Sequence, residues 1–508
     1  MQIPDWLARR AALHPERPAL IAGSPGAPSR RVYTFSQLSA WADALAGMLV
    51  ARGLAPGDRV AILARNSASY AALVHAAPRA AVVLVPLNTR LAPTELAWQL
   101  ADSGATLLLY DEAHAELAAT LCAEQGRGAA TVPLQTALLE ADAPSFSPLP
   151  LGRRLTLDAP HTIIYTSGTT GRPKGAVLTA GNHWWSATAS VLNLGLCDDD
   201  RWLAVLPLFH VGGLSILLRG AIYGIPVLLH ERFDPAAALA ALADDRATIA
   251  SLVAVMLQRM IETGGEAPWP AHFRCALLGG GPAPRPLLEA CAARGVPVAQ
   301  TYGLTETASQ VATLAPADAL RKLGSAGQPL LPLELRVLTT DGREAEPGEV
   351  GEICVRGPMV TPGYHGRPEA TAEAIRDGWL HTGDLGALDE EGYLYVADRR
   401  SDLIISGGEN IYPAEVEAVL MAHPAVSEAG VVGEPEARWG QVPLAFVVLR
   451  PEVPVPPEVE LIAFCRARLA AYKVPRAIRV VPSLPRTASG KLRRAELRAL
   501  LATPSGLP

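Results

Sequence analysis

The chain has 508 residues, of which 49% are hydrophobic and 19% charged, and its formal net charge is −6. At about 150 residues per domain this length suggests roughly two to four domains, and such a chain can fold without a disulfide or metal. The composition excludes a mostly disordered chain. The slightly acidic balance argues against a protein that coats nucleic acid or anionic lipid.

The six cysteines form no C-x-x-C pair and match no zinc-site spacing, and the N-terminus lacks the apolar segment of a signal peptide. We therefore expect a cytoplasmic protein. The apolar stretch 203–218 is interrupted by Pro207, His210 and Gly212. It predicts a buried strand–turn–helix and no stable insertion in a membrane.

Strand and helix signals alternate in the first part of the chain. Apolar residues at helical spacing from Leu38 to Leu49 predict a helix that Ser36 caps and Gly53 ends. Further helices are expected to begin at Ser67 and Thr94, with Gly104 ending the latter, and strands are expected at 60–63, 81–85 and 106–110. This alternation predicts an α/β fold with parallel or mixed sheets that helices cover on both faces.

The later parts of the chain differ in character. The stretch 143–160, rich in Pro and Ser, predicts a connection between lobes. Short β-like runs at 351–356 and 393–396 predict a small β-rich lobe, and the roughly 100 residues after Arg399 predict a separate α+β domain. We expect an N-terminal domain over 1–399 and a C-terminal domain over 402–508.

The strongest motif is YTSGTTGRPKG, which begins at Tyr165 and lies between two β-branched runs. Its glycines let backbone N–H groups turn inward, its hydroxyls add donors and its lysine adds positive charge, which suits a polyphosphate. It is not a Walker A loop, because Pro173 precedes the lysine. The candidate phosphate-binding residues are Thr166, Ser167, Gly168, Thr169, Thr170, Gly171 and Lys174.

Four later motifs occur with it: QTYGLTET from Gln300, WLHTGD from Trp379, SDLIISGGEN from Ser401 and PRTASGK from Pro485. Together they resemble the adenylate-forming superfamily of acyl-CoA synthetases, adenylation domains and luciferases, over nearly the whole chain. In those enzymes ATP and a carboxylate give an acyl adenylate and pyrophosphate, and a thiol then displaces AMP. The resemblance implies ATP, Mg²⁺ and CoA, and a C-terminal domain that changes orientation between the two steps.

The resemblance also implies roles for single residues. Glu306 matches the Mg²⁺ ligand, Asp384 the carboxylate that binds both ribose hydroxyls, and Lys491 the lysine that contacts the reacting carboxylate and the α-phosphate. The implied catalytic residues are Lys491, Thr166, Glu306 and His210. Beyond the phosphate loop, the implied nucleotide-binding residues are Gly280, Gly281, Thr301, Tyr302 against the adenine, Gly303, Thr305 at the phosphates, Asp384, Arg399 and Lys491.

The segment after the expected hinge at Arg400 and Ser401 matches the loop that lines the pantetheine tunnel in related ligases. The implied CoA-binding residues are Ser406, Gly407, Gly408 and Glu409. Many relatives carry Asp or Lys at the hinge position where this chain has Ser401. We therefore predict where the hinge lies, but we assign no role to a charge at the hinge position.

Several runs, among them PLFHVGGLSILLRG and LLGGGPAPRPLLE, resemble the group of 2-succinylbenzoate–CoA ligases of menaquinone biosynthesis. In that group Arg219 matches the basic position that pairs with the benzoate carboxylate, and an arginine fork suits a planar carboxylate. The implied acid-binding residues are His210, Gly212, Arg219, Gly279 and Ser309.

The expected activity is an AMP-forming acid–CoA ligase, with 2-succinylbenzoate as the acid. Three alternatives stay open: a ligase for a medium-chain fatty or aryl acid, an adenylation enzyme for a carrier protein, and an ATP-binding relative without activity. The expected partners are small molecules and not nucleic acid, and the sequence leaves open an assembly of identical chains.

Overall fold

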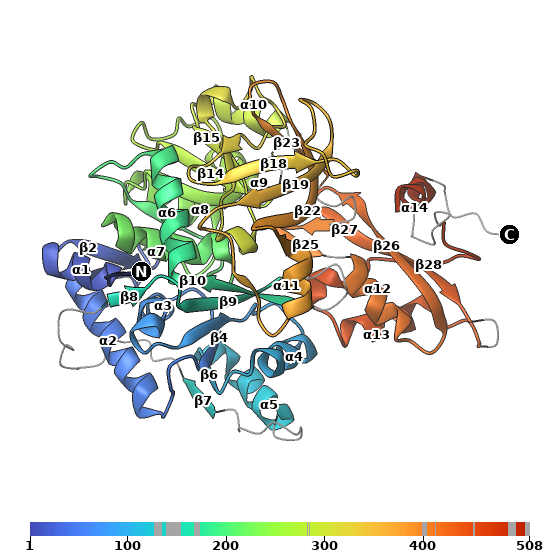
Figure 1. Ribbon diagram of the computed structural model, residues 1–508, viewed down its shortest axis with the longest axis horizontal. Helices are drawn as coiled ribbons and strands as arrows, with labels where there is room; N and C mark the ends of the chain where they lie inside the picture. The colour runs from blue at the N-terminus through green and yellow to red at the C-terminus, as the bar shows by residue number, and fades with distance from the viewer. Residues whose placement is uncertain are drawn as a thin grey trace. The chain divides into compact units, whose positions relative to one another are not determined.

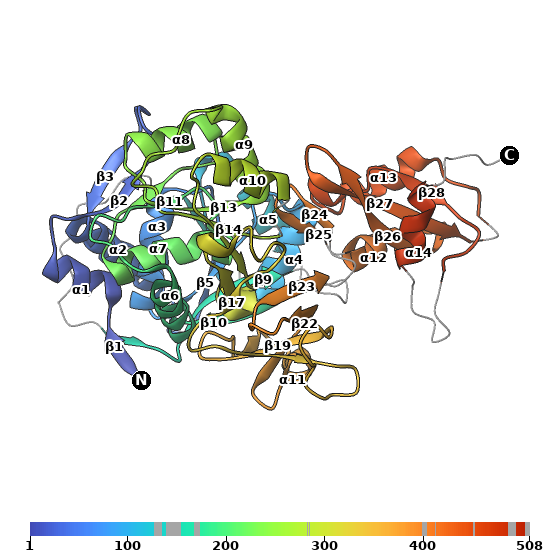
Figure 2. The same ribbon diagram turned by 90° about the horizontal axis from the view of Figure 1, so that it is seen from above.

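The computed structural model describes residues 1–125, 135–138, 154–166, 173–281, 283, 285–398, 404–411, 413–450, 453–485 and 494–502. The chain folds into two compact units (Figures 1 and 2). The first unit holds residues 1–89, 100–164 and 175–397, and the second holds 90–99, 165–174 and 398–508.

A first large sheet has parallel strands at its centre. Strands β9, β5, β4, β6 and β7 run parallel, and β20 pairs antiparallel with β10 at one edge. In spatial order its strands are β20 (Gly363–Tyr364), β10 (Lys174–Thr179), β9 (Pro160–Thr166), β5 (Val83–Pro86), β4 (Arg59–Leu63), β6 (Leu107–Tyr110) and β7 (Gln135–Leu138). The predicted runs at 60–63, 81–85 and 106–110 correspond to β4, β5 and β6.

A second large sheet is parallel from β2 to β15 and has antiparallel strands at both edges. Its order is β17 (Gln328–Pro329), β16 (Ala312–Leu314), β15 (Val298–Tyr302), β14 (Cys275–Gly279), β13 (Ile249–Val253), β11 (Trp202–Ala204), β12 (Val227–Leu229), β2 (Pro18–Ala22) and β3 (Arg31–Thr34). Separately, β1 (Gln2–Pro4) pairs with β8 (Arg154–Thr156).

Helices cover these sheets, as the alternation of signals predicted. The main core joins α2, α3 and α7 to residues of both large sheets, and a second core packs α8, α9 and α10 against the second sheet (Figure 2). The helices of the first unit are α1 (Trp6–Leu13), α2 (Phe35–Ala51), α3 (Ala68–Arg79), α5 (Ala115–Gln125), α6 (Ala180–Leu194), α7 (Val211–Tyr223), α8 (Pro235–Ala243), α9 (Ala254–Gly264), α10 (Arg285–Ala293) and α11 (Pro368–Ala374). Helix α4 (Pro93–Ser103) contributes to both units.

Helix starts follow the side chains that can cap them. Ser67 caps α3 as predicted, but the predicted cap of α2 at Ser36 is wrong. Thr34 caps that helix, because its hydroxyl accepts from Gln37 N–H while the Gln37 side chain accepts from Thr34 N–H. This reciprocal pair satisfies two backbone donors, which a cap at Ser36 would leave without helical partners.

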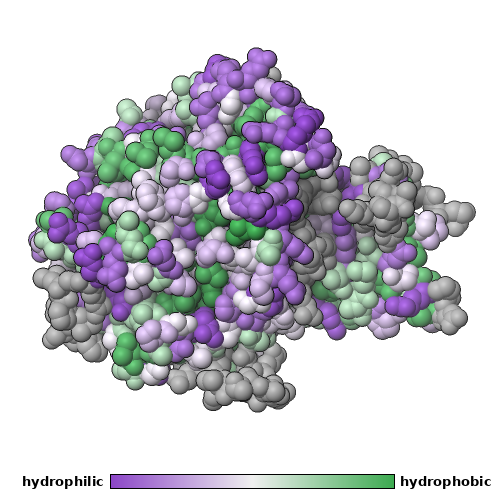
Figure 3. Space-filling view, in the orientation of Figure 1, coloured by the Kyte–Doolittle hydropathy of each residue, from purple (hydrophilic) through white to green (hydrophobic). Residues whose placement is uncertain are grey.

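The small β-rich lobe predicted near 340–398 is an antiparallel sheet of the first unit. Its strands are β18 (Glu334–Leu338), β19 (Gly351–Arg356), β22 (Trp379–Leu388) and β21 (Ile375–Arg376), with β23 (Leu394–Asp398) paired to β22. Hydrophilic side chains gather over this region on the face drawn in Figure 3. The lobe carries exposed ion pairs such as Arg343–Glu349 and Arg356–Glu334.

The second unit has its own mixed sheet and core. The sheet orders β25 (Glu409–Ile411), β24 (Ile404–Ser406), β27 (Gly440–Leu449) and β26 (Val426–Glu436), with β28 (Ile478–Val480) parallel to β27. Helices α12 (Pro413–Met421) and α13 (Glu458–Arg466) pack on it, and α14 (Arg494–Ala499) contributes to a smaller cluster. This is the predicted α+β arrangement, but the unit also includes residues 90–99 and 165–174.

A buried ion cluster lies within the second unit. Lys473 Nζ donates to Glu95 Oε1 and to Glu415 Oε1, both at 2.7 Å. Glu95 Oε2 also accepts from Ala470 N–H. Burial raises the pKa of Glu415 to about 7, with Lys473 opposing the shift and Glu95 adding to it.

Within the described ranges, the chain has no helix with the length and apolar character needed to span a bilayer. The expected strand–turn–helix at 203–218 is β11 followed by α7. Of the cysteines, Cys197 is exposed, Cys122 is half-buried and four are buried.

Candidate active site

The first part of the site lies where two neighbouring parallel strands end. β14 ends at Gly279 and β15 at Tyr302, and in open α/β sheets ligands bind outside the carboxyl ends of the strands. Gly279 is the last residue of β14, Gly280 and Gly281 follow it, and Gly280 has a φ of +83°. The hydroxyl of Thr301 in β15 donates to Ala312 O at 2.8 Å across the β15–β16 pair, so this side chain is already engaged within the sheet.

The loop after β15 is tightly constrained. A Cβ on Gly303 would lie 1.5 Å from Ser309 O, so only glycine fits there. Ala308 and Ser309 adopt φ values of +51° and +117°, which non-glycine residues rarely do. Strain of this kind concentrates at functional sites. The short 3₁₀ turn Thr305–Thr307 within this loop carries Thr305 and Glu306.

The Glu306 carboxylate is half-buried and accepts a hydrogen bond at Oε1 from the Tyr364 hydroxyl, at 3.0 Å. A single carboxylate beside threonine hydroxyls suits Mg²⁺, which uses few protein ligands and completes its shell with water and phosphate oxygens. These residues therefore fit the expected ion. The contribution of Tyr364 was missed, because 58 residues separate it from Glu306.

Asp384 and Tyr302 meet although 82 residues separate them. The Tyr302 hydroxyl donates to Asp384 Oδ2 at 2.7 Å, and both side chains are buried. Asp384 N–H donates to Thr382 Oγ1, which in turn donates to Ile353 O. The phenol of Tyr302 thus orients the carboxylate expected to bind ribose. A stacking role of Tyr302 on adenine stays a prediction.

Three of the expected acid-binding residues lie at α7: His210, Gly212 and Arg219. His210 precedes this helix as its N-cap, and its ring lies 4.7 Å from that of Phe209, centroid to centroid. A Cβ on Gly213 would lie 2.2 Å from Pro207 O, whereas one on Gly212 would meet only Leu206 Cδ1 at 3.6 Å. Gly213 is therefore required by the turn, and Gly212 keeps space open.

Arg219 extends from α7 into the interior and is 2% exposed. Its Nη2 donates to Ser186 Oγ at 3.4 Å and its guanidinium lies 5.4 Å from the Trp202 ring centroid, while Nε has no hydrogen-bond partner. Burial lowers the pKa of Arg219. In the part of the chain that the structure describes, no carboxylate forms an ion pair with it. A buried cation in this state favours an anionic ligand.

In the second unit, Thr166 and Lys174 lie at the two ends of the phosphate loop. Thr166 Oγ1 donates to Lys174 O at 3.4 Å, and the Tyr165 ring packs edge-on against Trp98. The other expected loop residues and four further candidates lie outside the described residues: Ser167, Gly168, Thr169, Thr170, Gly171, Arg399, Arg400, Ser401 and Lys491.

The four expected CoA-binding residues form a β-hairpin end with a two-residue turn. Ser406 pairs with Glu409, and Gly407 and Gly408 between them have φ values of +57° and +86°. Positive φ at both central positions is the geometry of a type I′ turn, which favours glycine. A Cβ on Gly407 would lie 2.7 Å from the Trp439 ring. Trp439 comes from the distant β26–β27 turn and was not a candidate in the sequence.

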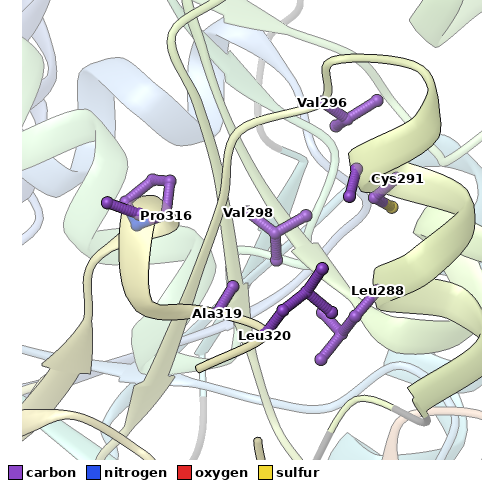
Figure 4. Close-up of a pocket in the computed structure, with 9 residues that line it drawn as sticks. Leu288, Cys291, Val296, Val298, Pro316, Ala319 and Leu320 are labelled. Atoms are coloured by element: carbon purple, nitrogen blue, oxygen red, sulfur yellow. The ribbon is translucent and has the colours of Figure 1, made fainter. Parts of the chain in front are cut away.

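A small pocket lies near the start of β15. It has a volume of about 140 Å³, and α10, β15 and the 316–320 turn line it with apolar side chains (Figure 4). Figure 4 shows Leu288, Val298 and Leu320 pointing toward one another across it. No charged side chain lines the pocket, so it differs chemically from the site described above.

Comparison with known proteins agrees with the motifs. Residues 7–365 match the AMP-binding enzyme family and residues 415–491 match the AMP-binding enzyme C-terminal domain. A 2-succinylbenzoate–CoA ligase of Geobacillus kaustophilus is 54% identical over 499 residues, with 98% of each chain covered.

Two solved structures of o-succinylbenzoate CoA synthetase from Bacillus subtilis are 45% identical to this chain. One is a double mutant bound with the product analogue OSB-NCoA, with a TM-score of 0.88 and 98% of each chain covered. The other is a complex with ATP and magnesium ion, with a TM-score of 0.73, covering 98% of this chain and 100% of the other.

Proposed function

Since this chain belongs to the AMP-binding enzyme family, we propose that it is an AMP-forming acid–CoA ligase that converts 2-succinylbenzoate and CoA to 2-succinylbenzoyl-CoA in menaquinone biosynthesis. The relative at 54% identity carries the name of this activity. The observation in this chain that carries the choice of acid is Arg219, a buried cation with no ion-pair partner among the described carboxylates. The substrates are small molecules, and a cytoplasmic location is part of the proposal.

The proposed acid has two carboxylates with different roles. The benzoate carboxylate pairs with Arg219, where a charge-assisted hydrogen bond in a desolvated interior is strong. The succinyl carboxylate is the one activated. Gly212 and Gly279 leave room for the ring, and His210 lines the acyl pocket. A fatty acid gains nothing from Arg219, because its chain has no group to pair with a guanidinium.

The nucleotide binds to both negatively and positively charged groups. Asp384 accepts hydrogen bonds from the ribose hydroxyls, and Lys174 with the hydroxyls of the phosphate loop donates to the phosphates. Glu306 holds Mg²⁺, which neutralises part of the phosphate charge when it is bound.

The reaction proceeds in two steps. A carboxylate oxygen of the acid attacks the α-phosphorus of ATP, and pyrophosphate leaves. The sulfur of CoA then attacks the acyl carbon, and AMP leaves with the electrons of the broken C–O bond. We assign the first step to a state completed by Lys491 and the second to one in which the hairpin Ser406–Glu409 faces the thiol, with domains over 1–399 and 402–508 and a hinge at 400–401.

Lys491→Ala tests this division of labour. The variant is expected to lose adenylation by about 10²–10³-fold, since a cation at developing negative charge contributes at that scale. It should largely keep thioester formation from supplied acyl adenylate. Assays of the two half-reactions, quenched at timed intervals, measure both rates. An equal loss in both contradicts the proposed alternation between two domain orientations.

The activity itself is tested with the purified protein, ATP, Mg²⁺ and CoA and one acid at a time. The acids are 2-succinylbenzoate, benzoate, octanoate and malonate, and the products are identified by mass spectrometry. A thioester from 2-succinylbenzoate alone is the expected result. A thioester from another acid contradicts the role of Arg219, and adenylate without CoA transfer favours a carrier-protein enzyme.

A further inference from the structure

A cluster of polar side chains lies next to the strand segment that carries Asp384. Glu352 and Cys354 come from β19 and His381 from β22, and Cys354 lies directly opposite His381 in the strand register. A β-bulge interrupts the register between Glu352 and Cys354. Bulges of this kind redirect side chains and often lie beside active sites.

The Glu352 carboxylate bridges two residues just before Asp384. Gly383 N–H donates to Oε1 at 3.0 Å, and His381 Nδ1–H donates to Oε2 at 2.9 Å, because a carboxylate can only accept. Thr382, between them, donates its hydroxyl to Ile353 O at 2.7 Å. Three consecutive residues of β22 are therefore held to β19 immediately before the carboxylate that meets Tyr302.

This arrangement is more than general packing. The Glu352 side chain is 31% exposed, so water is an available partner and burial does not force its two hydrogen bonds. Gly383 has a φ of +69°, which turns its N–H toward Glu352 and so sets the direction in which the chain enters Asp384. A charge-assisted bond to that single N–H fixes the turn more firmly than a neutral one would.

We propose that Glu352 is a positioning residue for nucleotide binding: through Gly383 and His381 it holds Asp384 in the orientation that accepts the ribose hydroxyls. This inference rests on the ribose role of Asp384 in the proposed function. It adds a residue that acts through the backbone and touches no substrate.

The same cluster invites a different interpretation, as a transition-metal site, because a thiol, an imidazole and a carboxylate converge within 4.8 Å. One observation favours the hydrogen-bonded arrangement. Arg336 lies opposite Cys354 in the register, which places a cation beside the site, where it would oppose a bound metal ion.

The test measures AMP affinity by titration calorimetry, without acid or CoA, and KM values for ATP and acid. In Glu352→Ala the dissociation constant of AMP and the KM for ATP should rise about tenfold, the scale of one hydrogen bond to a charged group, with the KM for the acid unchanged. Glu352→Gln should recover most of the affinity, because its carbonyl oxygen can still accept from Gly383. Glu334→Ala, which removes an exposed carboxylate of the same lobe, should have no effect.

Three results would overturn the proposal. Unchanged AMP affinity in Glu352→Ala would remove the positioning role, and an equal rise in the KM for the acid would indicate general damage. Loss of affinity in Cys354→Ser to the level of Glu352→Ala would point to a metal site, since the proposal expects less than about a twofold change there.

If Glu352→Ala does not fold, His381→Ala replaces it in the test, with an expected loss of AMP affinity of about threefold. Wild-type protein that binds AMP but makes no thioester would contradict the proposed function and leave this test valid.

Discussion

In the proposed function, Arg219 serves substrate binding at the expense of stability. A buried guanidinium without a carboxylate partner costs several kcal/mol of desolvation, which Ser186 Oγ and the Trp202 ring offset only in part. Such a group is stable in a fold when a ligand supplies the missing charge. It lies on α7, 9 residues after His210 along the chain, and the proposed acid pocket includes both residues.

Arg219→Leu should separate these two effects. We expect the KM for 2-succinylbenzoate to rise about 100-fold, as when one partner of a buried charge pair is removed. The KM for benzoate should change much less, because a monocarboxylate is activated at its only acid group. The melting temperature should stay level or rise, since an uncompensated buried charge is lost.

The matched control for this change is Arg9→Leu, which replaces an exposed arginine of α1. It should leave both KM values and the melting temperature as they are. Equal effects of Arg219→Leu on the two acids would remove Arg219 from the acid pocket, and a large fall in melting temperature would show that its role is structural.

At the scale of elements, the sequence predicted what local pattern determines. Apolar spacing located α2, α3 and the strands β4 to β6 to within a few residues, because each buries one face or is buried on both. The cap of α2 was misplaced, since Thr34 and Ser36 are both good caps and only the reciprocal bond with Gln37 selects between them. Partners from distant parts of the chain, such as Tyr364 for Glu306 and Trp439 for Gly407, have no local signal at all.

Asp5 offers a test of how elements are joined. It caps α1 by accepting from Ala8 N–H at 2.7 Å, and it forms a buried ion pair with Arg79 of α3, which also pairs with Asp43. Burial alone would raise the pKa of Asp5, but Arg79 and the Ala8 N–H bring it below 3.8. The ionised carboxylate therefore stabilises the fold above pH 3.8, and this contribution is lost as pH falls through the lower pKa of the folded state.

We expect Asp5→Asn to lose about 3 kcal/mol of stability at neutral pH, which corresponds to a fall in melting temperature of about 5 °C or more. The difference from wild type should shrink below pH 3.8. Thermal unfolding across pH measures both effects. The control is Asp234→Asn, since Asp234 caps α8 at the surface through Ala237 N–H. A similar loss in both variants would assign the effect to capping alone.

At the scale of the whole molecule, the sequence predicted two parts but not all of their membership. The change in composition near Arg399 agrees with the start of the last segment of the second unit at residue 398. The segments 90–99 and 165–174 join that unit through contacts such as Glu95 with Lys473, which are 378 residues apart. No pattern within ten residues of Glu95 could reveal that pairing. The hinge and domain functions stay predictions.

Lys473→Met tests how far the two carboxylates of this ion cluster depend on the Lys473 cation. Glu95 and Glu415 would remain buried without their cation, so a proton must bind between them. Because the pKa of Glu415 in the fold, about 7, already lies above its ordinary value, stability falls as pH rises from 4.5 through 7, and the variant should steepen that fall.

The melting temperature of Lys473→Met should drop by several degrees at pH 8 and by less at pH 6, when compared with wild type by thermal unfolding. Arg466→Met, an exposed change on α13, is the control and should show no such pH dependence. A loss that is the same at both pH values would mean that Lys473 acts through packing of its aliphatic stem.

The distribution of the cysteines has a practical consequence for optical work on this protein. Burial raises the pKa of four thiols to about 11 or 12, which slows their reaction with maleimides: Cys275, Cys291, Cys354 and Cys465. Cys197 is exposed, so a fluorophore should couple there first without any substitution, with Cys122 second. A second dye at Arg466→Cys would then let energy transfer follow the proposed alternation. A transfer efficiency that changes when pyrophosphate leaves would support it, and a constant efficiency would contradict it.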